Sequence, residues 1–328
     1  MTAAERIADQ PARRPGGRSR WVDIDGPVHY LDFGGPAHAP LIVAIHGLGG
    51  AAVNWVAIAP LLTRKYRLLA VDLAGHGLTV SGGRDADVAS NRSLLHRFIQ
   101  SVSARPVILM GNSMGGMIAL LEASAEPASV AALILLDPAL PLQPVRPDPV
   151  VAAVFAASSL PVIGPLLIRQ RRLMPVQAIV SSTLALCCAH PARVPKDIVE
   201  QHVLVAKQRA AMAGNDRDFA HAARSVFETA SFLRGQAYRR GIRAVSCPVL
   251  LVHGQRDRLV PVAMARMAAR AHPDWSLAEL PDVGHVPQLE APADTAAVIK
   301  AWLSGPGKPA ARAAGRPLLA VPAPRKAS

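Results

Sequence analysis

Residues 107–116 of the chain read Val-Ile-Leu-Met-Gly-Asn-Ser-Met-Gly-Gly. The first four are an apolar run typical of a buried strand, and from Met114 onward apolar residues recur at the spacing of a helix. Between them, Gly111-Asn112-Ser113-Met114-Gly115 fits the pattern G-x-S-x-G, in which a sharp strand-to-helix turn exposes the serine hydroxyl. The stretch therefore predicts Ser113 as a catalytic nucleophile.

A serine hydroxyl is a weak nucleophile near neutral pH and needs a neighbouring base. His285 follows Gly284 in a loop between the strand-like run 276–280 and a final helical pattern. Of the 11 histidines, it is the one with this placement. We therefore predict that His285 is the general base.

The base in turn needs a carboxylate that orients it. Asp257 lies just beyond the apolar run 249–252 and gives the chain order Ser113, Asp257, His285, which is the order that accompanies this serine motif. Asp137 ends an earlier apolar run and is the alternative. We predict Asp257 as the acid and keep Asp137 as its rival.

Acyl transfer develops an oxyanion, which requires preorganised backbone donors. Met114 stands at the predicted start of a helix, where an amide has no partner inside the helix. Residues 46–50 read His-Gly-Leu-Gly-Gly and follow the apolar run 41–45, so this loop can aim the amide of Leu48 at the same point. We predict that Leu48 and Met114 form the oxyanion hole.

Along the rest of the chain, short apolar runs alternate with helical patterns, which indicates a mainly parallel central sheet flanked by helices. Runs that are apolar at every position predict central strands, because parallel strands are buried on both faces. The predicted strands are residues 28–33, 41–45, 67–71, 107–110, 133–136, 249–252 and 276–280. The predicted helices cover residues 94–102, 114–122, 263–271 and 295–302.

The stretch 138–244 breaks this alternation, because it is helical and interrupted by prolines. We predict that it forms an inserted helical lid over the carboxyl edge of the sheet. Within it, residues 149–168 carry no charge and are followed by Arg169, Arg171 and Arg172. We expect these segments to line an apolar pocket, and docking on anionic lipid is the alternative.

Five segments follow from these patterns. The α/β core occupies residues 19–137 and 245–305, and the lid occupies residues 138–244 between them. A basic leader, 1–18, and a basic tail rich in alanine and proline, 306–328, are predicted to be flexible because they lack a sustained apolar period.

Composition narrows the classes of function. The net charge is +13, but much of it lies in the two ends and no aromatic stacking platform accompanies it, so we expect no nucleic-acid partner. Three cysteines, two of them adjacent, cannot form a disulfide framework, and the first residues lack the apolar segment of a secretion signal. We predict a cytoplasmic protein, with peripheral membrane contact through the lid and basic ends as a further hypothesis. No metal-ligand or nucleotide-binding motif is present, so no cofactor and no metal are expected.

Together the motifs resemble the α/β-hydrolase superfamily over residues 28–304, and this resemblance implies an α/β-hydrolase fold and chemistry without a cofactor. Serine at position 113 differs from the carboxylate nucleophile of the epoxide hydrolases and haloalkane dehalogenases. Residues 285–290, His-Val-Pro-Gln-Leu-Glu, are similar to esterases and lipases. The segments that carry the resemblance are residues 46–50, 72–77, 111–116, 253–257 and 284–285.

We therefore expect a serine hydrolase that cleaves a small carboxylic ester with an apolar acyl group through an acyl-enzyme on Ser113. The elbow Gly-Asn-Ser-Met-Gly-Gly also resembles the meta-cleavage-product hydrolases, which cut carbon–carbon bonds, although Val286 stands where those enzymes tend to carry tryptophan. Such a hydrolase is the second candidate. A non-catalytic binding protein on the same fold is the third, because a fold alone does not establish activity.

Overall fold

The computed structural model describes residues 16–141, 148, 173–212, 214–231 and 234–308. Most of the two predicted flexible ends lies outside the described residues. The apolar run 149–168 and the arginines Arg169, Arg171 and Arg172 also lie outside them.

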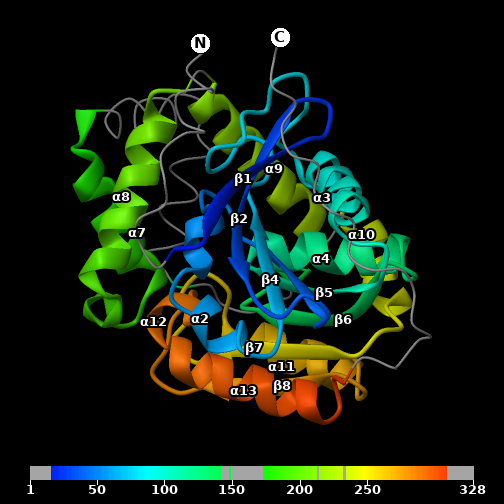
Figure 1. The fold of residues 1–328 in the computed structure, drawn as a ribbon. Coiled ribbons are helices and arrows are strands. Elements are labelled where there is room, and N and C mark those ends of the chain that lie inside the picture. Colours follow the sequence, from blue (N-terminus) through cyan, green and yellow to red (C-terminus); the bar gives the residue numbers. More distant parts are fainter. Residues whose placement is uncertain (1–15, 142–147, 149–172, 213, 232–233, 309–328) are drawn as a thin grey trace.

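An eight-stranded sheet forms the centre of the molecule (Figure 1). Its strands are β1 (Arg18–Asp23), β2 (Pro27–Gly34), β3 (Leu41–Ile45), β4 (Arg67–Val71), β5 (Val107–Asn112), β6 (Val130–Leu136), β7 (Val249–Gly254) and β8 (Ser276–Leu280). They lie in the order β1-β2-β4-β3-β5-β6-β7-β8. Strand β2 pairs antiparallel with β1 and β4, and every other pairing is parallel. The predicted mainly parallel sheet is confirmed.

Strand β1 is the strand that the sequence pattern misses. Its residues read Arg-Ser-Arg-Trp-Val-Asp, and most of them are exposed or half-buried because β1 is an edge strand. An antiparallel edge strand can face solvent and therefore needs no continuous apolar run. Arg18, predicted as the last residue of the leader, is the first residue of this strand.

The register of the parallel strands aligns their carboxyl ends. Ile45 of β3 pairs with Gly111 of β5, Asn112 of β5 pairs with Leu136 of β6, and Leu136 pairs with Val252 of β7. In open parallel sheets, ligands bind beyond this carboxyl edge. The loops that follow β3, β5, β6 and β7 therefore meet at one place.

Helices cover both faces of the sheet (Figure 1). On one face the apolar sides of α3 (Val88–Val102), α4 (Met114–Ala125), α10 (Gln236–Ala244) and α11 (Val262–Ala271) enter one core cluster. On the other face, η1 (Ala52–Trp55), α2 (Ala59–Leu62) and α13 (Pro292–Ser304) enter a second cluster. Because both faces are covered, the central strands are buried throughout.

The inserted region is helical where the structure describes it. It contains α7 (Val176–Cys187), η2 (Pro191–Arg193), α8 (Lys196–Ala210), α9 (Asn215–Ala230) and α10. Apolar residues of α7 and α8 pack against η1 and the short helix α12 (Pro287–Glu290) in a third core cluster. None of the helices in the described segments combines the length and apolar character needed to cross a bilayer.

Helix α8 is also anchored by a buried charge. The guanidinium of Arg209 donates to the carbonyl oxygen of Gly75 and lies 3.6 Å from the carboxylate of Asp218 in α9. Its side chain is 9% exposed, so this ion pair is largely removed from water. The contact connects the inserted helices to the loop that follows β4.

Candidate active site

Ser113 lies at the junction between β5 and α4, as the elbow motif predicts. Its backbone has φ 54° and ψ −118°, a conformation that residues with a side chain rarely adopt. The flanking glycines permit this turn. A Cβ atom at Gly111 would lie 2.4 Å from the carbonyl oxygen of Gly115, and one at Gly115 would lie 2.2 Å from that of Ile45.

The structure brings the predicted base and acid together. Nδ1 of His285 lies 2.7 Å from Oδ2 of Asp257, and both side chains are buried. Oδ1 of Asp257 accepts hydrogen bonds from the amides of Leu259 and Val260 at 2.8 and 3.0 Å. Every oxygen of this carboxylate therefore has a donor, and its orientation toward His285 is fixed.

The electrostatics keep Asp257 ionised. Burial by itself raises the pKa of Asp257, but the interactions of the carboxylate with His285 and His253, hydrogen bonds among them, outweigh burial and hold the pKa well below its ordinary value. An ionised carboxylate that accepts from Nδ1 fixes the imidazole tautomer and leaves Nε2 of His285 as the proton acceptor.

The main chain of His285 is held from two sides. Its amide donates to the carbonyl oxygen of Cys187, at the end of α7, at 2.6 Å. Its carbonyl oxygen accepts from the side-chain amide of Asn112, the residue before Ser113, at 3.0 Å. Among the described residues, no side chain forms a hydrogen bond with the Ser113 hydroxyl, and Asn112 is the link between the serine and the histidine.

The loop that carries Leu48 approaches Ser113, and Met114 follows the serine directly in the chain. The loop 46–50 follows β3, and a Cβ atom at Gly47 would lie 3.0 Å from Cβ of Ser113. Met114 is the first residue of α4. Within the described ranges, no backbone hydrogen bond uses the amide of Leu48 or Met114 as donor.

A buried polar network supports the oxyanion loop from below. Nδ1 of His46 donates to the carbonyl oxygen of Gly47 at 2.7 Å, and Nε2 accepts from the amide of Leu73 at 3.2 Å. Burial lowers the pKa of His46, which favours the neutral ring that these two bonds need. Asp72 accepts from the amide of Ala52 at 2.6 Å. Asp72 thus holds this loop region and does not contact the triad.

Glu290 is a site residue that the sequence did not single out. Its buried carboxylate accepts from the amides of Ala189, His190 and Gly284 at 3.2, 2.7 and 2.8 Å. These amides come from the segment after α7 and from the loop that carries His285. The single carboxylate therefore fastens the inserted region to the loop of the predicted base. Its position on a short helix just after His285 was the available signal.

Asp137, the rival acid, occupies a different place. It follows β6, and its Oδ1 accepts from the amide of Gly254 at 2.9 Å. Asp257, not Asp137, is the hydrogen-bond partner of His285. Asp137, His253 and Asp257 nevertheless lie close together, with one side-chain oxygen or nitrogen of each within 4.8 Å of the others.

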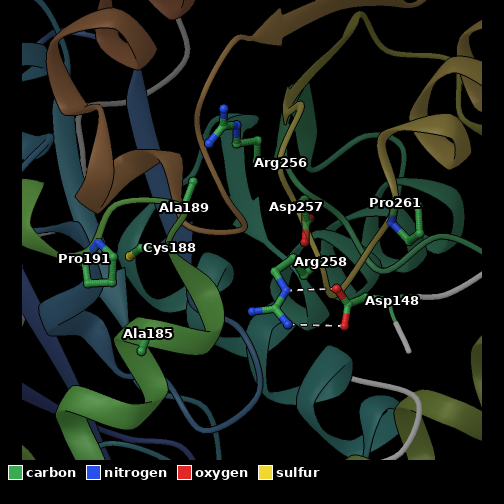
Figure 2. A pocket seen from close by; sticks show the side chains of 9 residues that line it. All are labelled: Asp148, Ala185, Cys188, Ala189, Pro191, Arg256, Asp257, Arg258 and Pro261. Carbon is green, nitrogen blue, oxygen red and sulfur yellow. Dashed lines mark hydrogen bonds and ion pairs between the residues drawn. The ribbon is translucent and has the colours of Figure 1, made fainter. Parts of the chain in front are cut away.

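A cavity of about 540 Å³ opens beside Asp257. Figure 2 shows it between the end of α7 and the loop that carries Asp257, with Arg258 paired to Asp148. It is lined by Asp148, Ala185, Cys188, Ala189, Pro191, Arg256, Asp257, Arg258 and Pro261. This lining mixes charged and apolar groups. The apolar pocket expected from residues 149–168 falls outside the described residues.

Known proteins are similar to this chain in sequence and in architecture. Residues 42–298 match the alpha/beta hydrolase family. The chain is 26% identical to a monoacylglycerol lipase of Homo sapiens over 84% of this chain and 81% of that protein. It is 29% identical to a pimeloyl-[acyl-carrier protein] methyl ester esterase of Aromatoleum aromaticum over 81% of this chain and 99% of that protein.

Two further proteins are similar to this chain, and the chain spans a different share of each. A dihydrolipoyllysine-residue acetyltransferase component of an acetoin cleaving system from Pseudomonas putida is 25% identical over 80% of this chain, and the chain spans 63% of its length, which is less than two thirds. The crystal structure of a membrane phospholipase A superposes with a TM-score of 0.67 at 25% identity, covering 89% of this chain and 87% of that one.

Proposed function

The chain belongs to the alpha/beta hydrolase family and is an ester hydrolase, and we propose that it cleaves a carboxylic ester with an apolar acyl group through an acyl-enzyme on Ser113. The observation that supports this most is the 2.7 Å contact between Nδ1 of His285 and Oδ2 of Asp257, tied through Asn112 to the serine. It is the pairing that a serine nucleophile requires of its base.

The proposed reaction has two halves. Nε2 of His285 takes the proton from the Ser113 hydroxyl as the serine oxygen attacks the ester carbonyl, and the amides of Leu48 and Met114 stabilise the oxyanion. His285 then returns the proton to the departing alcohol, which leaves the acyl group on Ser113. In the second half a water molecule gives its proton to His285, attacks the acyl-enzyme and releases the carboxylic acid.

A series of p-nitrophenyl esters from acetate to octanoate tests the acyl preference. If the acyl chain enters an apolar pocket, each buried methylene contributes up to about 0.8 kcal/mol, or about fourfold in kcat/KM. We expect kcat/KM to rise with chain length until the pocket is full. A flat series with good turnover would overturn the apolar preference and leave ester hydrolysis in place.

Carbon–carbon bond hydrolysis is the alternative activity, and it is assayed beside the ester series. Its substrate, a coloured 2-hydroxy-6-ketodienoate, loses its colour on cleavage. Feeble ester turnover at every length beside rapid bleaching would replace our proposal with this activity. Absence of both activities would favour the non-catalytic binding protein.

We also propose a cytoplasmic location with contact at a membrane surface. The basic charge of the chain and the match to a membrane phospholipase A support this. Anionic lipid attracts basic segments, and salt screens that attraction. The protein should co-sediment with anionic vesicles and be released at high salt. Equal binding to neutral vesicles would remove the electrostatic part of the proposal.

A further inference from the structure

A second carboxylate is buried directly beside the acid of the triad. Asp137 follows β6 with φ 44°, and its side chain is 0% exposed. Oδ1 accepts from the amide of Gly254 at 2.9 Å, whereas Oδ2 is buried and has no hydrogen-bond partner among the described residues. An ionised oxygen left unpaired inside a protein is strongly unfavourable.

One imidazole, that of His253, lies between Asp137 and the acid of the triad. His253 of β7 places Nε2 at 3.6 Å from Oδ1 of Asp137 and at 3.4 Å from Oδ2 of Asp257. Beyond Asp257 stands His285, which is the partner of Asp257. The thiol of Cys187, on α7, is neutral, because burial and then the charge of Asp257 raise its pKa to about 12. Two carboxylates thus face one shared imidazole.

His253 is poorly placed to carry a proton on both nitrogens. Its Nε2 donates to the carbonyl oxygen of Val260 at 2.8 Å, but Nδ1 is buried and has no partner within the described ranges. An imidazolium would leave the Nδ1 hydrogen unpaired in the core, whereas a neutral ring leaves only a bare acceptor. Burial lowers the pKa of His253, but Asp137 and Asp257 outweigh burial and raise that pKa, so the ring and Asp137 compete for the extra proton of this cluster. The unpaired Nδ1 of His253 favours the carboxyl group of Asp137.

We propose that Asp137 is a neutral carboxylic acid in the folded protein and acts as a positioning residue, leaving Asp257 as the one charged carboxylate beside His285. Asp257 already accepts from His285, Leu259 and Val260, so the ionised form belongs to it and the protonated form to Asp137. Burial, and next the charge of Asp257, raise the pKa of Asp137 well above its ordinary value, although His253 opposes this. The effect on His285 rests on the proposed function, but the protonation of Asp137 does not.

Proton linkage tests the proposal without any activity assay. Above the pKa of an unfolded aspartate, the folded wild type binds one more proton than the unfolded chain, so its stability falls as pH rises until Asp137 ionises. Asp137→Asn cannot ionise and lacks this dependence. We measure the stability of both proteins by urea unfolding from about pH 5 to 9 and expect the difference between them to shift in favour of the variant as pH rises. The ratio of their unfolding equilibrium constants should change by up to tenfold per pH unit.

A matched control separates this effect from loss of any carboxylate. Asp25 is exposed, and a hydrogen bond from Arg97 lowers its pKa, so it is ionised in both states over the same range. Asp25→Asn should therefore show a constant offset from wild type. A constant offset for Asp137→Asn as well would overturn the proposal.

Infrared spectroscopy distinguishes a proton on Asp137 from one on His253, which would give the same linkage. A neutral carboxylic acid has a C=O stretch well separated from the carboxylate bands. We expect wild type to show this band at neutral pH and lose it at alkaline pH, and Asp137→Asn to lack it. Absence of the band from wild type would overturn the proposal, and this measurement remains decisive if the variant does not fold.

Discussion

Asn112 donates a hydrogen bond from its side-chain amide to the main-chain carbonyl of His285 at 3.0 Å. The same amide group donates to the carbonyl of Leu136 at 3.0 Å, so both of its hydrogens are used. The residue before the nucleophile thus connects β5 to the neighbouring strand and to the loop of the predicted base. This side chain is therefore one of the contacts that set the spacing between Ser113 and His285.

Replacement of Asn112 by leucine should disturb that spacing. Two buried carbonyls lose their donor, and the free energy of unfolding should fall by about 1–3 kcal/mol. Because His285 is then held less firmly, kcat/KM for p-nitrophenyl butyrate should fall by roughly ten- to hundredfold. Urea unfolding and steady-state kinetics measure the two effects.

Asn91→Leu is the matched control, because Asn91 is equally buried and hydrogen-bonds to Ala74 and Ala86 away from the triad. It should lose stability but keep more of the activity of its folded fraction. An Asn112→Leu enzyme as active as this control would assign Asn112 a purely structural part.

The nucleophile can be identified by covalent labelling. A fluorophosphonate should react with Ser113, because His285 activates the hydroxyl and the amides of Leu48 and Met114 stabilise the adduct. Ser113→Ala should abolish labelling, whereas Ser101→Ala, on the far helix α3, should keep it. Persistent labelling of the Ser113 variant would refute the assignment, and an unreactive wild type would favour a non-catalytic protein.

The two candidate acids should differ sharply in their effect on turnover. Asp257→Asn keeps the shape of the side chain but allows the wrong tautomer of His285, which should lower kcat by about four powers of ten. Asp137→Asn should lower it far less, because Asp137 does not contact His285. The measurement is kcat for one ester at saturation. The reverse ranking would move the acid to Asp137.

The carboxylate of Glu290 should matter to both stability and turnover. In Glu290→Gln, one of the two acceptor oxygens becomes an amide donor that opposes a backbone N–H, so the free energy of unfolding should fall by about 1–3 kcal/mol. Because the same bonds fix Gly284, next to the base, kcat should fall more than KM rises.

Glu279→Gln provides the comparison for Glu290, since Glu279 pairs with Arg266 near the surface. Exposed pairs of this kind contribute only about 0–1 kcal/mol. If the Glu290 variant were no more affected than the Glu279 variant, in stability and in kcat, the fastening role would be wrong.

The sequence predicts the central sheet well for a physical reason. Strands buried on both faces must be apolar over most of their length, and β3 to β7 are visible as apolar runs with polar residues only at their ends. The edge strand β1 has no such requirement, and the pattern does not reveal it. The sequence also predicts the elbow around Ser113, because its glycines are required by steric limits within a few residues of the serine.

The sequence does not predict the contacts that support the site, because the partners in each contact are distant in the chain. Asn112 binds a carbonyl 173 residues away, and Glu290 binds amides about 100 residues away. The sequence indicates Asp137 only as a possible acid, because the neighbours that determine its charge lie on β7 and the loop that follows it. Such relationships follow from the folded arrangement and have no local spacing.

Main-chain groups carry much of the connection between the inserted helices and the base loop, and the side chains of His190 and Arg193 add ion pairs with Asp282. The carbonyl of Cys187 accepts from the amide of His285, and Glu290 binds the amides of Ala189 and His190. The main-chain bonds constrain the path of residues 187–190, and a Cβ atom at Gly284 would lie 2.4 Å from the carbonyl oxygen of Cys187. A chimera that imports a foreign segment will therefore work only if the transplanted backbone re-enters along the same path past Gly284.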